Sequence, residues 1–188
     1  DLADAWPESV QQQADNLSED SVAAESTQAD REDLTDQPYV TIDSPGTQDM
    51  DDAFCLQVLD NGNLKLSLAL AWPGLTWDFT SDLDAEVAQR MSSLYLPEGT
   101  AHLLPQDIGI ELYSLRAGHD VPAFVVQMLL DPSGRVLDTD LRRTWVRLLD
   151  NLTYARAEEL LASAPETYNL GPAYDVASML RDLRIQQG

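Results

Sequence analysis

Four aspartates fall within ten residues of the stretch TIDSPGTQDMDDAFC, which spans residues 41–55. Carboxylates packed this closely repel one another unless water, protons or a cation neutralises them. Hard cations such as Mg²⁺ prefer carboxylate oxygens and are often bound together with substrate phosphate, where they assist phosphodiester cleavage. Metal-assisted phosphodiester cleavage is therefore one interpretation of Asp43, Asp49, Asp51 and Asp52.

Two other interpretations of the aspartates stay open on spacing alone. Most acidic runs are solvated surface loops, which need no metal. A calcium loop is disfavoured, because the spacing D-x5-D-x-D-D lacks the glycine after the third ligand and the terminal glutamate of an EF-hand. A calcium-dependent interaction module is therefore the weaker metal hypothesis.

Composition limits the class of protein. The 188 residues carry 33 acids and 11 bases, a net charge of −22, and nearly half of the acids precede residue 61. The one cysteine, Cys55, excludes an internal disulfide and is expected to be a buried, inert thiol. Neither a run of about 18 apolar residues nor a secretory leader is visible, so we expect no membrane span and a cytoplasmic protein.

The elements that position the aspartates are predicted to be strands. The β-rich run PYVTID ends at Asp43 and is broken by SPG, which places Asp43 at the end of a strand. Two apolar runs follow, joined by the turn sequence DNGN at residues 60–63. In the second run leucines alternate with Lys65, Ser67 and Ala69, a pattern typical of a half-buried hairpin strand whose leucines form one face: Leu64, Leu66, Leu68 and Leu70.

Helices and a second hairpin complete the expected fold. Ser81 is a predicted N-cap, and apolar residues at helical spacing predict a helix that ends near Pro97. A second hairpin is predicted around DPSG at residues 131–134, and two helices after Asn151. The predicted class is α+β, with mixed β-hairpins and helices. Residues 1–30 are polar and acidic and are interpreted as a linker or the end of a preceding domain, with a surface helix at residues 10–17 as the alternative.

The sequence from residue 31 resembles a known family. REDLTDQPYVTIDSPGTQDMDDAF closely resembles the opening of the catalytic domain of ribonuclease II (RNB) exoribonucleases, and ALAWP, YLP, LLP and SLR follow in the same order. The resemblance covers residues 31–188, which it identifies as the first half of an RNB-type catalytic domain. It implies that a later segment supplies a catalytic arginine and the rest of the RNA channel.

The resemblance implies a function and roles for named residues. It implies a Mg²⁺-dependent, hydrolytic 3′-to-5′ exoribonuclease that degrades single-stranded RNA to nucleoside 5′-monophosphates. By position, Asp43 and Asp52 match metal ligands, Asp51 matches the residue most closely tied to catalysis, and Asp49 matches a supporting acid. Tyr95 falls where the family places an aromatic ring against a nucleotide; without the family, a core or capping tyrosine is an equal interpretation.

Two departures and an alternative function remain. Trp72 stands where many relatives carry an acid, and His102 precedes LLP where relatives often have I-P-M-L-P; neither His102 nor His119 has the neighbours of a hydrolase triad. Basic residues are few, and Arg142 and Arg143 are interpreted as a solvated strand edge, so flanking RNA-binding domains would supply most of the positive surface. The alternative is a non-catalytic RNB-like module that binds RNA or a protein.

Overall fold

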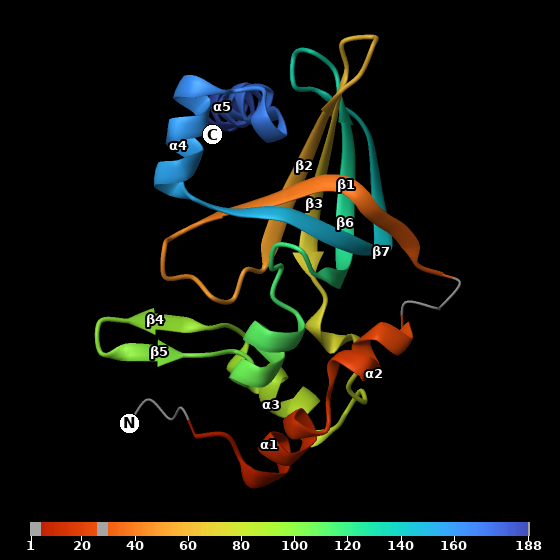
Figure 1. The fold of residues 1–188 in the computed structure, drawn as a ribbon, viewed down its shortest axis with the longest axis vertical. Helices are drawn as coiled ribbons and strands as arrows, with labels where there is room; N and C mark the ends of the chain where they lie inside the picture. The colour runs from red at the N-terminus through yellow and green to blue at the C-terminus, as the bar shows by residue number, and fades with distance from the viewer. Residues whose placement is uncertain (1–4, 26–29, 188) are drawn as a thin grey trace.

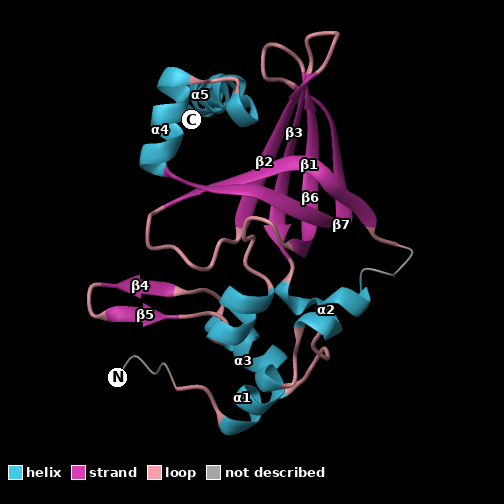
Figure 2. Cartoon of the chain, viewed as in Figure 1, coloured by secondary structure: helices cyan, strands magenta, loops and turns pink. Residues whose placement is uncertain are grey.

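The computed structural model describes residues 5–25 and 30–187. A β-barrel forms one part of the molecule, two helices lie beside it, and a mostly helical region with a projecting two-stranded hairpin lies beyond one end (Figure 1). Figure 2 shows the same division by secondary structure. The α+β class predicted from the sequence is confirmed. No helix in the described part of the chain combines the length and the apolar character needed to cross a membrane.

Five strands close the barrel in the order β1-β2-β3-β6-β7. Neighbouring strands are antiparallel except β1 and β7, which run parallel and close the barrel. The strands span β1 Glu32–Asp43, β2 Asp52–Val58, β3 Leu64–Ala71, β6 Asp120–Leu130 and β7 Val136–Thr153. Both predicted hairpins, β2–β3 and β6–β7, are therefore present.

The two faces of β3 differ in the size of their side chains. Ser67 and Ala69 are fully buried, whereas Leu68 and Leu70 are exposed. A five-stranded barrel is narrow, so small side chains fill its interior and the larger leucines point outward. The predicted alternation is confirmed, and the leucine face is the outer one: Leu64 and Leu66 pack against the cluster that contains Val176 of α5 (Leu170–Gln187).

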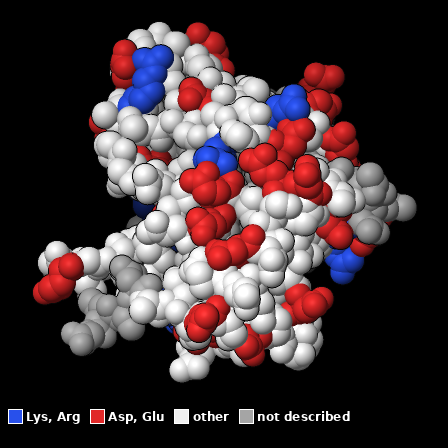
Figure 3. Space-filling model, turned by 60° about the horizontal axis from the view of Figure 1, so that its bottom comes forward, with Lys and Arg blue, Asp and Glu red and all other residues white. Residues whose placement is uncertain are grey.

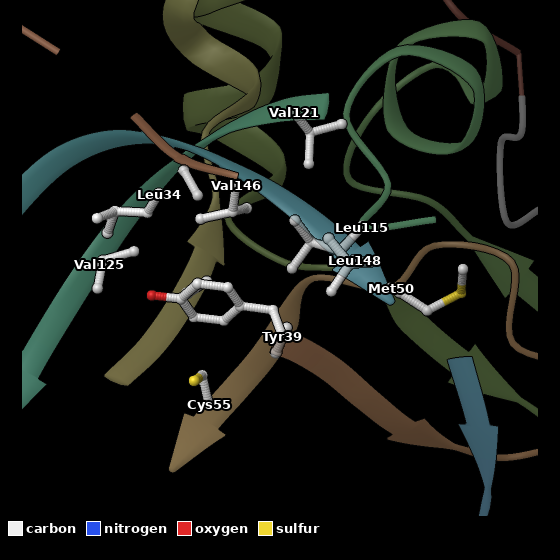
Figure 4. Packing of buried hydrophobic residues seen from close by; sticks show 12 residues of the cluster. Leu34, Tyr39, Met50, Cys55, Leu115, Val121, Val125, Val146 and Leu148 are labelled. Carbon is white, nitrogen blue, oxygen red and sulfur yellow. The ribbon is translucent and has the colours of Figure 1, made fainter. Parts of the chain in front are cut away.

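The barrel interior holds a continuous apolar core. Side chains of β1, β2, β6 and β7 converge around Tyr39, together with Met50 and Leu115 from loops at the barrel end (Figure 4). Cys55 belongs to this core and is 1% exposed. The predicted burial of Cys55 is confirmed, and burial raises the pKa of its thiol to about 11.

The helix after Ser81 is shorter than predicted. The Ser81 side chain accepts a hydrogen bond from the Asp84 backbone, as expected of an N-cap, but α3 spans Asp82–Arg90 only. Met91 takes a positive φ of 65°, which ends the helix. Leu94–Leu96 then forms β4, which pairs with β5 (Gly99–Ala101) in the projecting hairpin. Helical spacing of apolar residues had carried the predicted helix to near Pro97, about seven residues beyond its observed end.

The N-terminal segment is folded onto the rest of the chain. Helices α1 (Glu8–Asp15) and α2 (Glu19–Ala24) bury Val10, Ala14 and Val22 in a cluster that also contains Leu83 and Trp145. The described part of residues 1–30 is therefore not a loose linker, because its apolar residues are gathered on one side of two short helices. Whether it ends a preceding domain stays a prediction.

The C-terminal helices cover the outer face of β2. Helices α4 (Tyr154–Ser163) and α5 (Leu170–Gln187) follow Asn151, as predicted, and pack against Val40, Leu56 and Leu130. An apolar groove of about 580 Å³ remains between them and β3, lined by Leu68, Leu70 and Leu180 among others. Short helical turns complete the chain: η2 Pro73–Leu75, η3 Asp107–Leu112 and η4 Thr167–Asn169.

Candidate active site

The four predicted acids lie at one end of the barrel. Asp43 is the last residue of β1 and Asp52 the first of β2, and the loop between them carries Asp49 and Asp51. Strands β1 and β2 are neighbours, paired through Val40 and Phe54, so the end of one strand and the start of the next lie close together. The fold thus brings the two ends of this ten-residue acidic segment, Asp43 and Asp52, close together.

Asp51 shows how closely these charges approach one another. Its pKa is raised first by the partial desolvation of its carboxyl group and then by the negative charges of Asp49, Asp52 and Asp43, in that order. The Asp51 residue as a whole is exposed to solvent, but its carboxylate is partly covered by neighbouring protein atoms and so loses part of its hydration. A cation at this position would relieve the repulsion.

A divalent cation fits the donor chemistry of these residues. Oδ2 of Asp43 is buried and has no hydrogen-bond partner among the described residues, which leaves a hard oxygen ligand unused. No group of three or more acidic, histidine or cysteine side chains within the described ranges is gathered tightly enough to hold a metal unaided. Such a site suits Mg²⁺, which is commonly held by one or two carboxylates, water and substrate phosphate.

Tyr95 is part of the same site. Its hydroxyl donates a hydrogen bond of 2.9 Å to Oδ2 of Asp49, while 65% of the residue is exposed on β4. The projecting hairpin therefore presents an aromatic ring beside the acids. The core-tyrosine interpretation is wrong, because the ring is open to solvent.

His102 was not predicted to lie at the site. Its Nδ1 is 3.8 Å from Oδ2 of Asp49, and both residues line a pocket of about 40 Å³ with Asp51 and Ser93. The strand pairing of β4 and β5 brings His102, which follows β5, back toward the acids. No local sequence signal marks this proximity.

Ser114 holds the aspartate loop in place and was also missed. Its Oγ accepts a hydrogen bond from the Met50 backbone N–H at 3.0 Å and donates one to the Gln48 carbonyl at 2.9 Å. The Leu115 N–H donates to the Met50 carbonyl at 2.9 Å. Ser114 is 2% exposed, so these bonds fix the backbone on both sides of Asp49 from within the protein. The SLR motif was the only signal for it.

Trp72, where the family resemblance led us to expect an acid, makes aromatic and cationic contacts. Its ring centroid lies 4.3 Å from that of Phe124, and the Arg31 guanidinium lies 5.2 Å from the Trp72 ring. The backbone N–H of the preceding Ala71 donates to the Asp51 carbonyl at 2.9 Å. Trp72 therefore directly follows the residue that bonds the aspartate loop, and its side chain adds no charge there.

The arginines near the barrel are largely paired with acids. Arg142 contacts Glu32 at 2.9 Å, Arg143 contacts Asp30 at 2.8 Å, and Arg147 contacts Asp120 at 2.5 Å. Acidic side chains gather in a band across the face shown in Figure 3, where basic ones are scattered. This surface offers little attraction to a phosphate backbone.

The RNB domain family matches residues 31–188. This chain belongs to the RNB domain family. The match covers Tyr95, His102, Ser114 and the four aspartates.

Named relatives and solved structures support the same family. Exoribonuclease 2 of Edwardsiella piscicida is 36% identical over 183 residues, which is 96% of this chain and 26% of that protein. Among solved structures, Mycoplasma genitalium RNase R in complex with ribose-methylated single-stranded RNA matches 98% of this chain and 29% of its own, with a TM-score of 0.88 and 25% identity. Yeast Ssd1, described as a pseudonuclease, shares the fold over 90% of this chain and 20% of its own (TM-score 0.73, 23% identity). The chain thus spans about a quarter of the length of these proteins.

Proposed function

We propose that this RNB domain segment carries the acidic active-site loop of a 3′-to-5′ exoribonuclease that hydrolyses single-stranded RNA to nucleoside 5′-monophosphates. The observation that carries the proposal is the gathering of four aspartates beside an exposed tyrosine at one end of the barrel. The similarity to Exoribonuclease 2, which extends over 96% of this chain, supports the reaction class.

Mg²⁺ is the proposed cofactor, held by Asp43 and Asp52. When bound, it would supply Lewis-acid stabilisation of charge on the phosphate. Asp43 fits this role because its Oδ2 is buried and without a partner among the described residues. Asp51 is proposed as the aspartate most directly involved in catalysis. Asp49 has a supporting role, because its hydrogen bond with Tyr95 orients the tyrosine ring.

Tyr95 is proposed to stack on a nucleotide near the RNA 3′ end. Its ring is exposed while its hydroxyl is fixed to Asp49, so the ring is held in place before a base arrives. Stacking on an aromatic side chain contributes about 1–3 kcal/mol per base in single-strand binders. The tyrosine therefore would align the terminal nucleotide with the acids.

Further protein is proposed to complete the RNA path. The acidic surface argues that flanking RNA-binding domains supply most of the positive charge. In a longer chain, the apolar groove between β3 and α5 is the surface that we expect another segment of the RNB domain to cover. We propose a cytoplasmic location, consistent with the unpaired, buried Cys55.

The experiment compares Asp51→Asn with Asp60→Asn in the full-length protein. Asp60 lies in the β2–β3 turn, at the opposite end of β2 from Asp52, and serves as a matched change of charge. Mononucleotide release from 5′-labelled single-stranded RNA with Mg²⁺ should be lost in Asp51→Asn and kept in Asp60→Asn, while RNA binding persists in both. If the unmodified protein binds RNA without releasing nucleotides, the non-catalytic alternative holds instead.

A further inference from the structure

A second pocket, of about 490 Å³, lies apart from the aspartates. It is enclosed by α2, the start of β1, the segment from η3 to Arg116, and the adjoining ends of β6 and β7. We call it the Trp145 pocket, after the residue that β7 contributes to its wall. The exoribonuclease proposal makes no use of this pocket.

Three buried N–H donors on its walls lack acceptors. Nε of Arg31, Nε of Arg116 and Nε1 of Trp145 have no hydrogen-bond partner among the described residues. The Arg31 side chain is 8% exposed and Trp145 is 7% exposed, so bulk water does not readily satisfy their donors; the Arg116 side chain is 29% exposed, but its Nε atom is itself buried. Buried polar groups are normally hydrogen-bonded, and each exception calls for an explanation. Three exceptions in the wall of one cavity point to a ligand that brings acceptors.

The charge of the pocket restricts which acceptors fit. Four acids line it against two arginines, and each arginine already has a carboxylate partner: Arg31 contacts Glu25 at 3.0 Å and Arg116 contacts Glu111 at 3.3 Å. A phosphate or carboxylate would therefore meet net repulsion. The acids can instead accept hydrogen bonds from N–H groups of an uncharged ligand.

The remaining walls and the size of the pocket fit a small organic ligand. Val22, Leu112 and Val121 line it between the polar groups. Its volume lies within the range typical of small-molecule sites, which combine apolar walls with a few placed polar groups. The ligand indicated is uncharged and combines apolar surface with acceptors and N–H donors, a combination that heterocyclic bases have.

We propose that the Trp145 pocket binds a nucleobase, with guanine as the best match. Guanine presents N7 and O6 as adjacent acceptors, the edge that arginine recognises in nucleic acids, and carries N–H donors on its opposite edge. In the pocket, these acceptors would take hydrogen bonds from the unpartnered donors of Arg31, Arg116 and Trp145, and the N–H groups would donate to lining acids such as Asp33. The base comes either from a free nucleoside or from an RNA strand.

Calorimetric titration of the full-length protein with guanosine, adenosine, cytidine and uridine tests the proposal. Saturable binding with a preference for guanosine is expected. Trp145→Phe and Arg116→Lys each remove one donor while keeping ring or charge, and should weaken guanosine binding about three- to tenfold. The matched controls are Trp77→Phe and Arg156→Lys. The Trp77 N–H donates to Asp84 and Arg156 lies on α4, so neither variant should change guanosine binding.

Two further titrations sharpen the outcome. In EDTA, the affinity of a uridylate hexamer that contains one guanine is compared with that of the all-uridylate hexamer. If guanine raises the affinity of the hexamer above that of guanosine, the source of the base is an RNA strand. If the two hexamers bind with equal affinity while guanosine binds, the source is the nucleoside. Guanosine 5′-monophosphate should bind more weakly than guanosine. The proposal is overturned by equal affinity for guanosine and uridine, by tighter binding of the monophosphate, by indifference to both donor variants, or by no binding at all. Because none of these titrations needs RNA cleavage, failure here is distinct from failure of the exoribonuclease proposal.

Discussion

The hydroxyl of Tyr95 lies 2.9 Å from Oδ2 of Asp49, and this bond joins the projecting β4–β5 hairpin to the aspartate loop. The two residues are far apart in sequence and are brought together by the fold. The bond fixes the orientation of an exposed aromatic ring. It also raises the pKa of the tyrosine, for which burial is the larger cause and the nearby Asp49 the second.

Substitution of Tyr95 should separate stacking from hydrogen bonding. Tyr95→Ala removes the ring and is expected to weaken single-stranded RNA binding about 5- to 150-fold, the equivalent of about 1–3 kcal/mol. Tyr95→Phe removes only the hydroxyl and should stay within about threefold of the unmodified protein. Fluorescence anisotropy with labelled RNA in EDTA measures both. Equal losses in the two variants would mean that the Asp49 bond, and not the ring, carries the effect.

Asp52→Asn should alter the response to Mg²⁺. Replacing one proposed ligand removes a charged oxygen at the start of β2, so the Mg²⁺ concentration for half-maximal nucleotide release should rise about tenfold or more. Release is measured across a Mg²⁺ titration, with Asp60→Asn as the control. An unchanged midpoint would remove Asp52 from the metal site.

Ser114→Ala should impair activity through the aspartate loop. The Met50 N–H would be left buried without an acceptor, at a cost of about 1–3 kcal/mol in the free energy of unfolding, and the loop that carries Asp49 would loosen. Ser67→Ala is the control, because Ser67 is also buried but bonds Gln127 inside the barrel wall. Turnover under conditions where both variants are folded should fall only in Ser114→Ala. Equal turnover would limit Ser114 to a role in stability.

Cys55 should resist thiol reagents in the folded protein. Its pKa is raised to about 11 by burial, so little thiolate exists at pH 8 and reagent has no access. Modification is followed by mass spectrometry with and without urea, and should be complete only in urea. Because the folded pKa exceeds that of the unfolded chain, this group's contribution to stability is present at neutral pH and is lost as the pH rises above about 9. Rapid labelling of the folded protein would contradict the buried assignment.

Local signals predicted the elements, and long-range contacts decided the site. Alternation in β3 and the Ser81 cap depend on a few neighbouring residues, so the sequence reveals them directly. Ser114 bonds the backbone of a residue 64 positions earlier, and Asn151 bonds Thr41 across 110 positions where β1 and β7 run parallel. Such contacts have no periodic signature. The family resemblance therefore marked the acids and Tyr95, while the serine that holds their loop emerged only from the structure.

Two turn glycines allow a matched test of packing between the second hairpin and α5. Gly62 and Gly134 have nearly equal positive φ values of 81° and 83°. A Cβ at Gly62 would meet only Pro132 at 3.8 Å, whereas a Cβ at Gly134 would lie 2.8 Å from Met179 Cε and 3.1 Å from its Cγ. Alanine at either site should cost about 1 kcal/mol in backbone strain.

Gly134→Ala should be the more destabilising change, because Met179 must also shift. Because the closest atoms belong to the end of a flexible methionine side chain, we expect a modest additional cost of about 1 kcal/mol in urea unfolding relative to Gly62→Ala. In the background of Met179→Ala, which opens the space, the two glycine variants should become equal, since only the shared backbone term remains. If Gly134→Ala matches Gly62→Ala while Met179 is present, then the methionine moves aside freely and the turn does not press on α5.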